Sequence, residues 1–88
     1  METRQNMKTY ETTDLYLAAC LKAVLDLPLP SIRREGRHSR FVFSVNSAEA
    51  DKVASDFYAD RLNVPARRFG QELRDLKGLL SQMRPGGA

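Results

Sequence analysis

The sequence predicts an α+β fold made of one small domain, with the element order β-α-β-β-α-α, a β-hairpin in the middle and a C-terminal helix pair. Three observations predict it. A nearly uncharged stretch of helical length precedes Gly36, a stretch with alternating aromatic residues follows it, and two amphipathic stretches at helical spacing come last. The chain of 88 residues is too short for a second domain and is near the lower limit for burying a useful core.

The first expected elements are a short strand within residues 7–12 and a helix over residues 14–27. Thr12 or Thr13 can cap this helix, which places Asp14 in its first turn. Apolar residues cover most of the circumference of the helix, and this pattern predicts that it is largely buried. The prolines of the following LPLP sequence end the helix, because proline disfavours helical geometry in the residue before it.

A β-hairpin is expected next, with Glu35 and Gly36 as the two central residues of its turn. The expected core face carries Ile32, Ser39, Phe41, Phe43 and Val45. The opposite face carries Arg33, His38 and Arg40, and Arg34 faces Arg37 beside the turn. A shift of the turn by one residue would change these pairings.

Two helices are expected after the hairpin. The first begins at Asn46 or Ser47 and continues to about Leu62, because its apolar residues recur at helical spacing. The second has Pro65 in its first turn, where proline is favoured. Its apolar positions follow alternating spacings of three and four residues and end at Leu80.

The ends of the chain bound the domain. Residues 1–6 and 83–88 are polar or rich in glycine, and we expect them to be a disordered lead-in and a disordered tail. This leaves residues 7–82 as the single α+β domain.

Composition argues against membrane and enzyme classes. No apolar stretch approaches the roughly 20 residues that cross a bilayer, and the first residues lack the apolar core of a secretory signal, so we expect a cytoplasmic protein. The chain has one histidine and one cysteine, without the spacing of a metal site or a nucleophile with its base. It also lacks a glycine-rich phosphate loop. We therefore expect a non-enzymatic protein with no cofactor, no metal and no membrane partner.

Basic residues are concentrated in two segments that flank an acidic one. Residues 31–46 carry four basic groups and one acidic group, residues 47–62 carry two and four, and residues 63–88 carry five and two. Ten of the 14 basic residues are arginine, whose planar group suits phosphate or carboxylate recognition. A nucleic acid or an acidic protein surface is therefore the expected partner.

Like charges crowded on the hairpin either meet acidic groups of the same protein or wait for an external anion. On the last helix, Arg67 and Arg68 stand in the first turn, where positive charge opposes the helix dipole and a bound anion would offset it. Arg68 can instead pair with Glu72, four residues on.

A segment with the sequence ADRLNVPARRFGQELRDL resembles the helix-turn-helix family. Ala59 stands where the first helix of that motif needs a small residue, and Asn63 takes the place of its usual glycine and can adopt the left-handed conformation. In that family the second helix enters the major groove, so the resemblance implies that Arg67, Gln71 and Arg74 face the bases. The apolar spacing alone turns the same three residues outward. The candidate nucleic-acid-binding residues are Arg33, Arg37, Arg40, Arg67, Arg68, Gln71 and Arg74.

The sequences MKTYETTDLYLAACL, RFVFSV and VPARRFGQELRDLKGLL carry a resemblance that extends over roughly residues 7–81. They are similar to a family of short bacterial and phage proteins known only as a domain of unknown function. The resemblance implies the strand-helix-hairpin-helix-helix order and a bacterial or mobile-element setting, and it implies no activity.

Two functions stay open. One is a nucleic-acid-binding accessory or regulatory protein, and the other is an interaction module or phage-type modulator that binds an acidic protein surface. A homodimer is compatible with so small a core.

Overall fold

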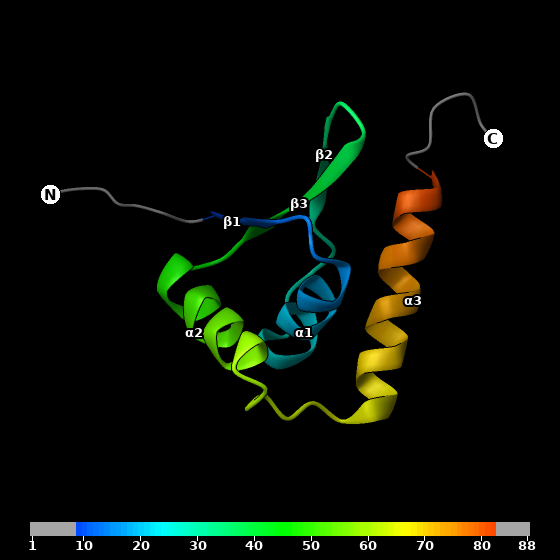
Figure 1. Cartoon of the computed structure of the whole chain (residues 1–88). Coiled ribbons are helices and arrows are strands. Elements are labelled where there is room, and N and C mark those ends of the chain that lie inside the picture. Colours follow the sequence, from blue (N-terminus) through cyan, green and yellow to red (C-terminus); the bar gives the residue numbers. More distant parts are fainter. Residues whose placement is uncertain (1–8, 83–88) are drawn as a thin grey trace, which may run out of the picture.

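A computed structural model describes residues 9–82, and its elements follow the order predicted from the sequence (Figure 1). The elements are β1 (Thr9–Thr12), α1 (Leu15–Leu25), β2 (Ser31–Glu35), β3 (His38–Ser44), α2 (Ser47–Tyr58) and α3 (Ala66–Gln82). The predicted α+β class and the order β-α-β-β-α-α are confirmed. The predicted lead-in and tail lie outside the described residues.

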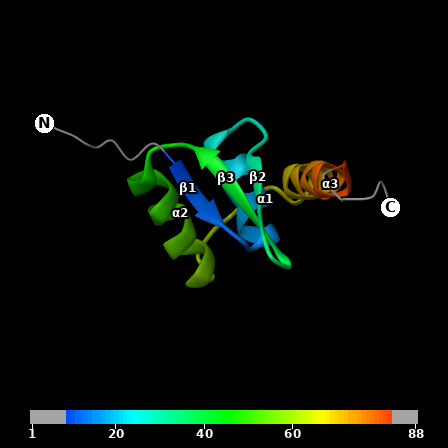
Figure 2. The ribbon, with the colours of Figure 1, turned by 90° about the horizontal axis from the view of Figure 1, so that it is seen from above.

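The three strands form one antiparallel sheet in the order β1-β3-β2. One face of this sheet lies over α1 and α2 (Figure 1) and carries the rings of Phe41 and Phe43, which are almost fully buried in the core. Figure 2 shows the sheet from above, with α3 standing at the side of the domain. Within the described part of the chain, no helix covers the other face of the sheet.

The central helix α1 lies between α2 and α3 (Figure 1) and begins at a carboxylate cap. Asp14 Oδ1 accepts hydrogen bonds from the backbone N–H groups of Tyr16 and Leu17 at 3.0 and 3.1 Å. Thr12 Oγ1 accepts from the backbone N–H of Asp14 at 3.0 Å. The predicted cap at Thr12 or Thr13 is therefore wrong, because Asp14 is the residue that satisfies the open N–H groups of the first turn.

The hairpin turn lies one residue later than the sequence pattern predicted. Its central residues are Gly36 and Arg37 rather than Glu35 and Gly36, and Glu35 pairs with His38. Gly36 has a φ of 61°, and a positive φ at the first central position is what two-residue hairpin turns require. Glycine adopts this conformation without steric cost, so the glycine sets the turn.

The shifted turn changes the strand partners and keeps the predicted faces. Arg33 lies opposite Arg40, and Arg34 lies opposite Ser39, so the predicted pairing of Arg34 with Arg37 is wrong. Moving the turn by one residue moves each partner by two positions along β3. Because side chains alternate with a period of two, every residue stays on its predicted face.

The helix α2 begins where the sequence predicts, whereas α3 begins at Ala66, so that Pro65 precedes its first turn instead of lying in it. Asn46 Oδ1 accepts from the backbone N–H groups of Ala48 and Glu49 at 2.8 and 3.4 Å, which makes Asn46 the N-cap of α2. The carbonyl of Pro65 accepts the first helical hydrogen bond of α3, from the N–H of Phe69, at 2.9 Å.

The end of α2 comes earlier than predicted, at Tyr58 instead of about Leu62. Asp60 has a φ of 61°, which turns the chain out of the helix. The N–H groups of Asp60 and Arg61 donate to carbonyls of the last helical turn at 3.1 and 2.8 Å. This pattern is the Schellman motif, with an aspartate where glycine is usual.

Replacement of two glycines should change stability in opposite directions. Gly78→Ala should raise the free energy of unfolding by about 0.5–1 kcal/mol, because alanine favours a helix interior and open space surrounds the position of the added Cβ. Gly36→Ala should lower it by about 1–2 kcal/mol, because a side chain disfavours the left-handed conformation. Urea unfolding measures both changes. A Gly36→Ala variant as stable as the parent would contradict the assigned turn.

Candidate nucleic-acid interface

The predicted binding residues divide between the hairpin and α3. Arg33, Arg37 and Arg40 belong to the hairpin, whereas Arg67, Arg68, Gln71 and Arg74 belong to the first half of α3. The hairpin turn and the beginning of α3 lie at opposite ends of the molecule (Figure 1). The two sets of residues therefore do not form one continuous track from Arg37 to Arg67.

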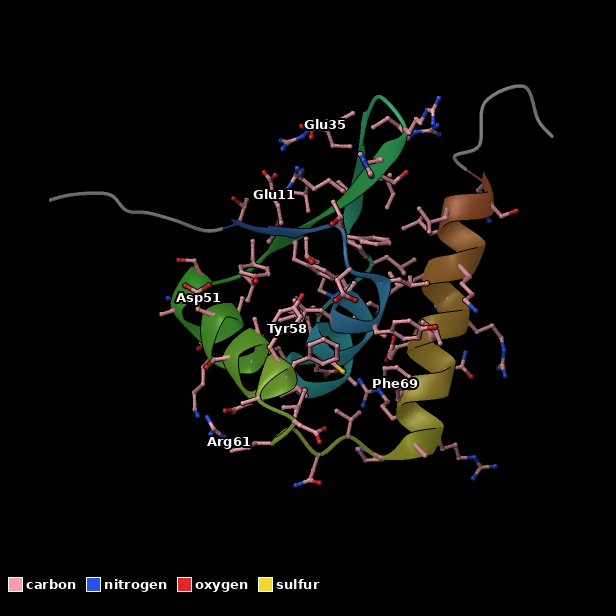
Figure 3. The ribbon with its side chains drawn as sticks, in the orientation of Figure 1. Glu11, Glu35, Asp51, Tyr58, Arg61 and Phe69 are labelled. Carbon is pink, nitrogen blue, oxygen red and sulfur yellow. The ribbon has the colours of Figure 1, made fainter. Side chains whose placement is uncertain are left out.

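The outer face of the sheet carries a network of two arginines and two glutamates. Arg33 Nη2 contacts Glu11 Oε1, and Arg33 Nε lies 3.3 Å from Glu35 Oε2. Arg40 Nη2 lies 3.2 Å from Glu35 Oε1, and its Nε lies 3.7 Å from Glu11 Oε1. Figure 3 shows Glu11 and Glu35 above the sheet, on the side away from α1 and α2. Each arginine thus meets both carboxylates, which offsets the repulsion between two directly paired arginines.

This network decides how available the hairpin arginines are. The hydrogen bond from Arg40, followed by the charges of Arg40 and Arg33, lowers the pKa of the Glu35 carboxyl. An external anion at Arg33 or Arg40 would compete with these glutamates. Arg37, at the exposed turn, forms no ion pair within residues 9–82.

A second group of charged residues forms ion pairs that link α3 to α1. Lys22 and Glu72 are each 7% exposed, and Lys22 Nζ lies 2.9 Å from Glu72 Oε1. Lys22 Nζ also donates to the carbonyl of Leu27 at 3.1 Å. Arg68 lies over this pair, with Nε 2.8 Å from Glu72 Oε2 and Nη2 2.8 Å from Asp26 Oδ1. The structure therefore gives Arg68 two carboxylate partners inside the domain.

Two opposing effects act on the buried Glu72 carboxyl. Burial raises its pKa, and the hydrogen bonds and charges of Arg68 and Lys22 lower it further than burial raises it. The net pKa is below the usual glutamate value, so Glu72 is a carboxylate at neutral pH. The signal in the sequence was a charge at a position that the helix pattern reserves for apolar residues, together with Lys22 in an otherwise apolar stretch.

The outer face of α3, defined here as Arg67, Gln71, Arg74 and Lys77, is exposed along the helix. Gln71 Nε2 donates to Asp75 Oδ1 at 3.1 Å, and Arg74 Nη1 donates to Gln71 Oε1 at 3.4 Å. None of the three cations of this face has an ion pair in the described part of the chain. The predicted outward orientation of Arg67, Gln71 and Arg74 is confirmed, and Lys77 extends the set by one turn.

The relation between α2 and α3 differs from that of the two helices in a helix-turn-helix. Residues 59–65 connect them, and α1 lies between them (Figure 1). Ala59 is exposed, and the left-handed residue of this connection is Asp60 rather than Asn63. The likeness is thus one of local sequence, and any contact of α3 with nucleic acid would be made by α3 without α2 beside it.

Comparisons with protein-family models, with curated proteins and with solved structures find no match to this chain. The resemblances noted in the sequence stay predictions.

No helix within residues 9–82 combines the length and apolar character needed to cross a membrane. The same residues contain no group of three or more histidine, cysteine, aspartate or glutamate side chains that could hold a metal ion.

Removal of the buried carboxylate should destabilise the domain strongly. Glu72→Gln leaves Lys22 buried without an anionic partner, so the free energy of unfolding should fall by about 3–5 kcal/mol. Asp51→Asn, an exposed carboxylate on α2, is the matched control and should change it by less than about 0.5 kcal/mol. Urea or thermal unfolding provides the measurement. A decrease in the free energy of unfolding of less than about 1 kcal/mol for Glu72→Gln would mean that the pair of Lys22 with Glu72 does not hold α3 in place.

Acid should remove the contribution of the Glu72 carboxylate to the free energy of unfolding. Because the pKa of Glu72 is lower in the folded state, its contribution to stability is complete above its unfolded pKa of about 4.3 and is lost as the pH falls through the folded value. The difference in unfolding free energy between the parent and Glu72→Gln should therefore shrink below about pH 4. A difference that stays constant from pH 7 to pH 3 would contradict the lowered pKa.

Proposed function

We propose that this domain is a non-enzymatic nucleic-acid-binding accessory or regulatory protein that presents the outer face of α3 to its partner. One observation carries the proposal. The outer face of α3 holds three cations without an ion pair in the described residues, whereas the arginines of the sheet network and of the α1–α3 contact are held by carboxylates.

The position of α3 supports insertion into a groove. The helix stands at the side of the domain (Figure 2), and the residues of its outer face are exposed. Its 17 residues extend about 25 Å at 1.5 Å per residue. The major groove of B-DNA is about 12 Å wide and admits one α-helix.

The side chains of this face suit both phosphates and base edges. Arg67, Gln71 and Arg74 are spaced by four and three residues, which places them along one side of the helix. Arginine donates two hydrogen bonds to guanine, and the glutamine amide donates one hydrogen bond to adenine and accepts one from it. The hydrogen bond between Gln71 and Arg74 holds these two side chains next to each other.

Arg67 supplies a further reason to expect an anion. It stands in the first turn of α3, where a positive charge opposes the helix dipole at a cost of about 0.3–1 kcal/mol. Arg68, its neighbour, is compensated by Asp26 and Glu72, and Arg67 has no such partner in the described range. A phosphate oxygen beside Arg67 would offset this cost.

The test compares two double variants that remove the same charge from different faces. Arg67→Ala with Arg74→Ala removes two cations from α3, and Lys52→Ala with Arg61→Ala removes two exposed cations from α2 and the segment after it. Fluorescence anisotropy with a mixed-sequence DNA duplex should show about tenfold weaker binding for the α3 variant at 50 mM salt. Its log–log salt slope should fall by about 1.8, which corresponds to two lost phosphate contacts.

The Kd of the control variant should stay within about threefold of the parent's Kd. This variant loses only the general attraction between opposite charges, which the α3 variant loses as well. Equal losses in both double variants would reject α3 as the interface. No binding of the parent to duplex DNA or single-stranded RNA at 50 mM salt would reject nucleic acid as the partner and favour an acidic protein surface.

A further inference from the structure

A cavity of about 240 Å³ lies where α1, the end of α2, the connection 59–65 and the beginning of α3 meet. It is lined by Cys20, Phe57, Asp60, Leu62, Val64 and Phe69. Asp60 is the charged member of this lining, and the others are apolar side chains and one thiol. Pockets for small molecules are commonly apolar with a few placed polar groups.

Aromatic rings from α2 and α3 line the cavity, and each contacts a tyrosine outside the lining. Phe57 meets Tyr58 edge to face at a centroid distance of 5.0 Å, and Phe69 stacks on Tyr16 of α1 at 6.3 Å. Tyr58 is 66% exposed and Tyr16 is 54% exposed, so each lining phenylalanine contacts an exposed tyrosine. Figure 3 shows Tyr58 and Phe69 on either side of α1. The hydroxyl of Tyr58 donates to Asp14 Oδ2 at 3.0 Å, which holds this ring in place.

The negative charge of Asp60 is unfavourable for the helix that it follows. Aspartate tolerates its φ of 61° better than most residues, but its position after α2 places a negative charge at the negative end of the helix dipole. Asp26, at the end of α1, has the same backbone conformation, but Arg68 lies 2.8 Å from its carboxylate. Within residues 9–82, Asp60 has no ion pair, because Arg61 turns to Asp56 at 3.8 Å. The charge of Asp60 is thus open to a cation from outside.

We propose that this cavity binds a hydrophobic organic cation, with the ammonium or guanidinium head beside Asp60 and the apolar stem between Phe57 and Phe69. The faces of aromatic rings attract cations, and ring-lined sites are a general solution for alkylated ammonium groups. The volume fits a small amine or one cationic side chain of a partner, which share this chemistry. The site is separate from the outer face of α3 and does not rest on the function proposed for it.

The thiol of Cys20 lines the site and is not a reactive group. Cys20 is 5% exposed and free. Burial, followed by the charge of Asp14, raises the pKa of the thiol above its usual value, so it stays protonated at neutral pH.

The test uses benzylamine, which is cationic at neutral pH, and benzyl alcohol, its neutral counterpart of nearly equal shape. Titrations followed by NMR should show saturable shifts at the lining residues, with a Kd at least tenfold lower for benzylamine. Asp60→Asn should bring the two Kd values within about twofold. Asparagine also adopts the left-handed conformation, so the variant keeps the end of α2. Asp56→Asn, a carboxylate at the same helix end and outside the lining, should keep the tenfold ratio.

A capped lysine, N-acetyl-lysine methylamide, distinguishes the two sources of the cation. Tighter binding of the capped lysine assigns a partner side chain, and tighter binding of benzylamine assigns a free amine. Equal Kd values for benzylamine and benzyl alcohol, or a ratio that Asp60→Asn leaves unchanged, would overturn the proposal.

Discussion

The buried ion pair of Lys22 with Glu72 is the constraint on which the placement of α3 depends. Each charge loses its hydration when it is buried, and this loss is offset only where the partner groups complete the hydrogen bonding. Arg68 supplies a second donor to Glu72, and the carbonyl of Leu27 accepts from Lys22. A pair of this kind contributes less to net stability than to uniqueness, because any other rotation of α3 would leave two buried charges without partners. The fully buried Leu76, one turn on, adds the apolar part of the contact.

The fixed rotation of α3 explains the distribution of charge over the whole domain. With Glu72 and Leu76 turned inward, the outer face of α3 is turned to solvent, and Arg68 lies at the border between the two sides. A cation at such a border meets carboxylates of a neighbouring element, and a cation on the outer face does not. The sheet follows the same rule, since its two paired arginines lie within reach of glutamates from β1 and β2. Within residues 9–82, Arg37, Arg67, Arg74 and Lys77 form no ion pair, and all four are exposed.

The sequence was sufficient for the element order, the faces of the hairpin and the outward side of α3, because these follow from periodicity. It was not sufficient for the turn, since centring it on Gly36 and Arg37 or one residue earlier places every side chain on the same face. The pairing of Glu35 with His38 in the fold separates the two registers and places Gly36, with its positive φ, at the first central position. The apolar pattern of α2 likewise continues to Leu62, and the left-handed Asp60 ends the helix before it. Spacing along the chain predicts the pair of Arg68 with Glu72, which the structure contains. It cannot show which distant charges meet, so the contacts of Arg68 with Asp26 and of Arg33 with Glu11 came only from the fold.

The two candidate surfaces have opposite charge, and the fold itself separates them. α3 turns Arg67 outward and Phe69 inward, so its first turns contribute a cation to one surface and an aromatic wall to the other. A polyanion along the outer face would be attracted by Arg67 and Arg74 and repelled near Asp60, which would keep it away from the cavity. A hydrophobic cation would have the reverse preference. One chemical group therefore cannot satisfy both surfaces.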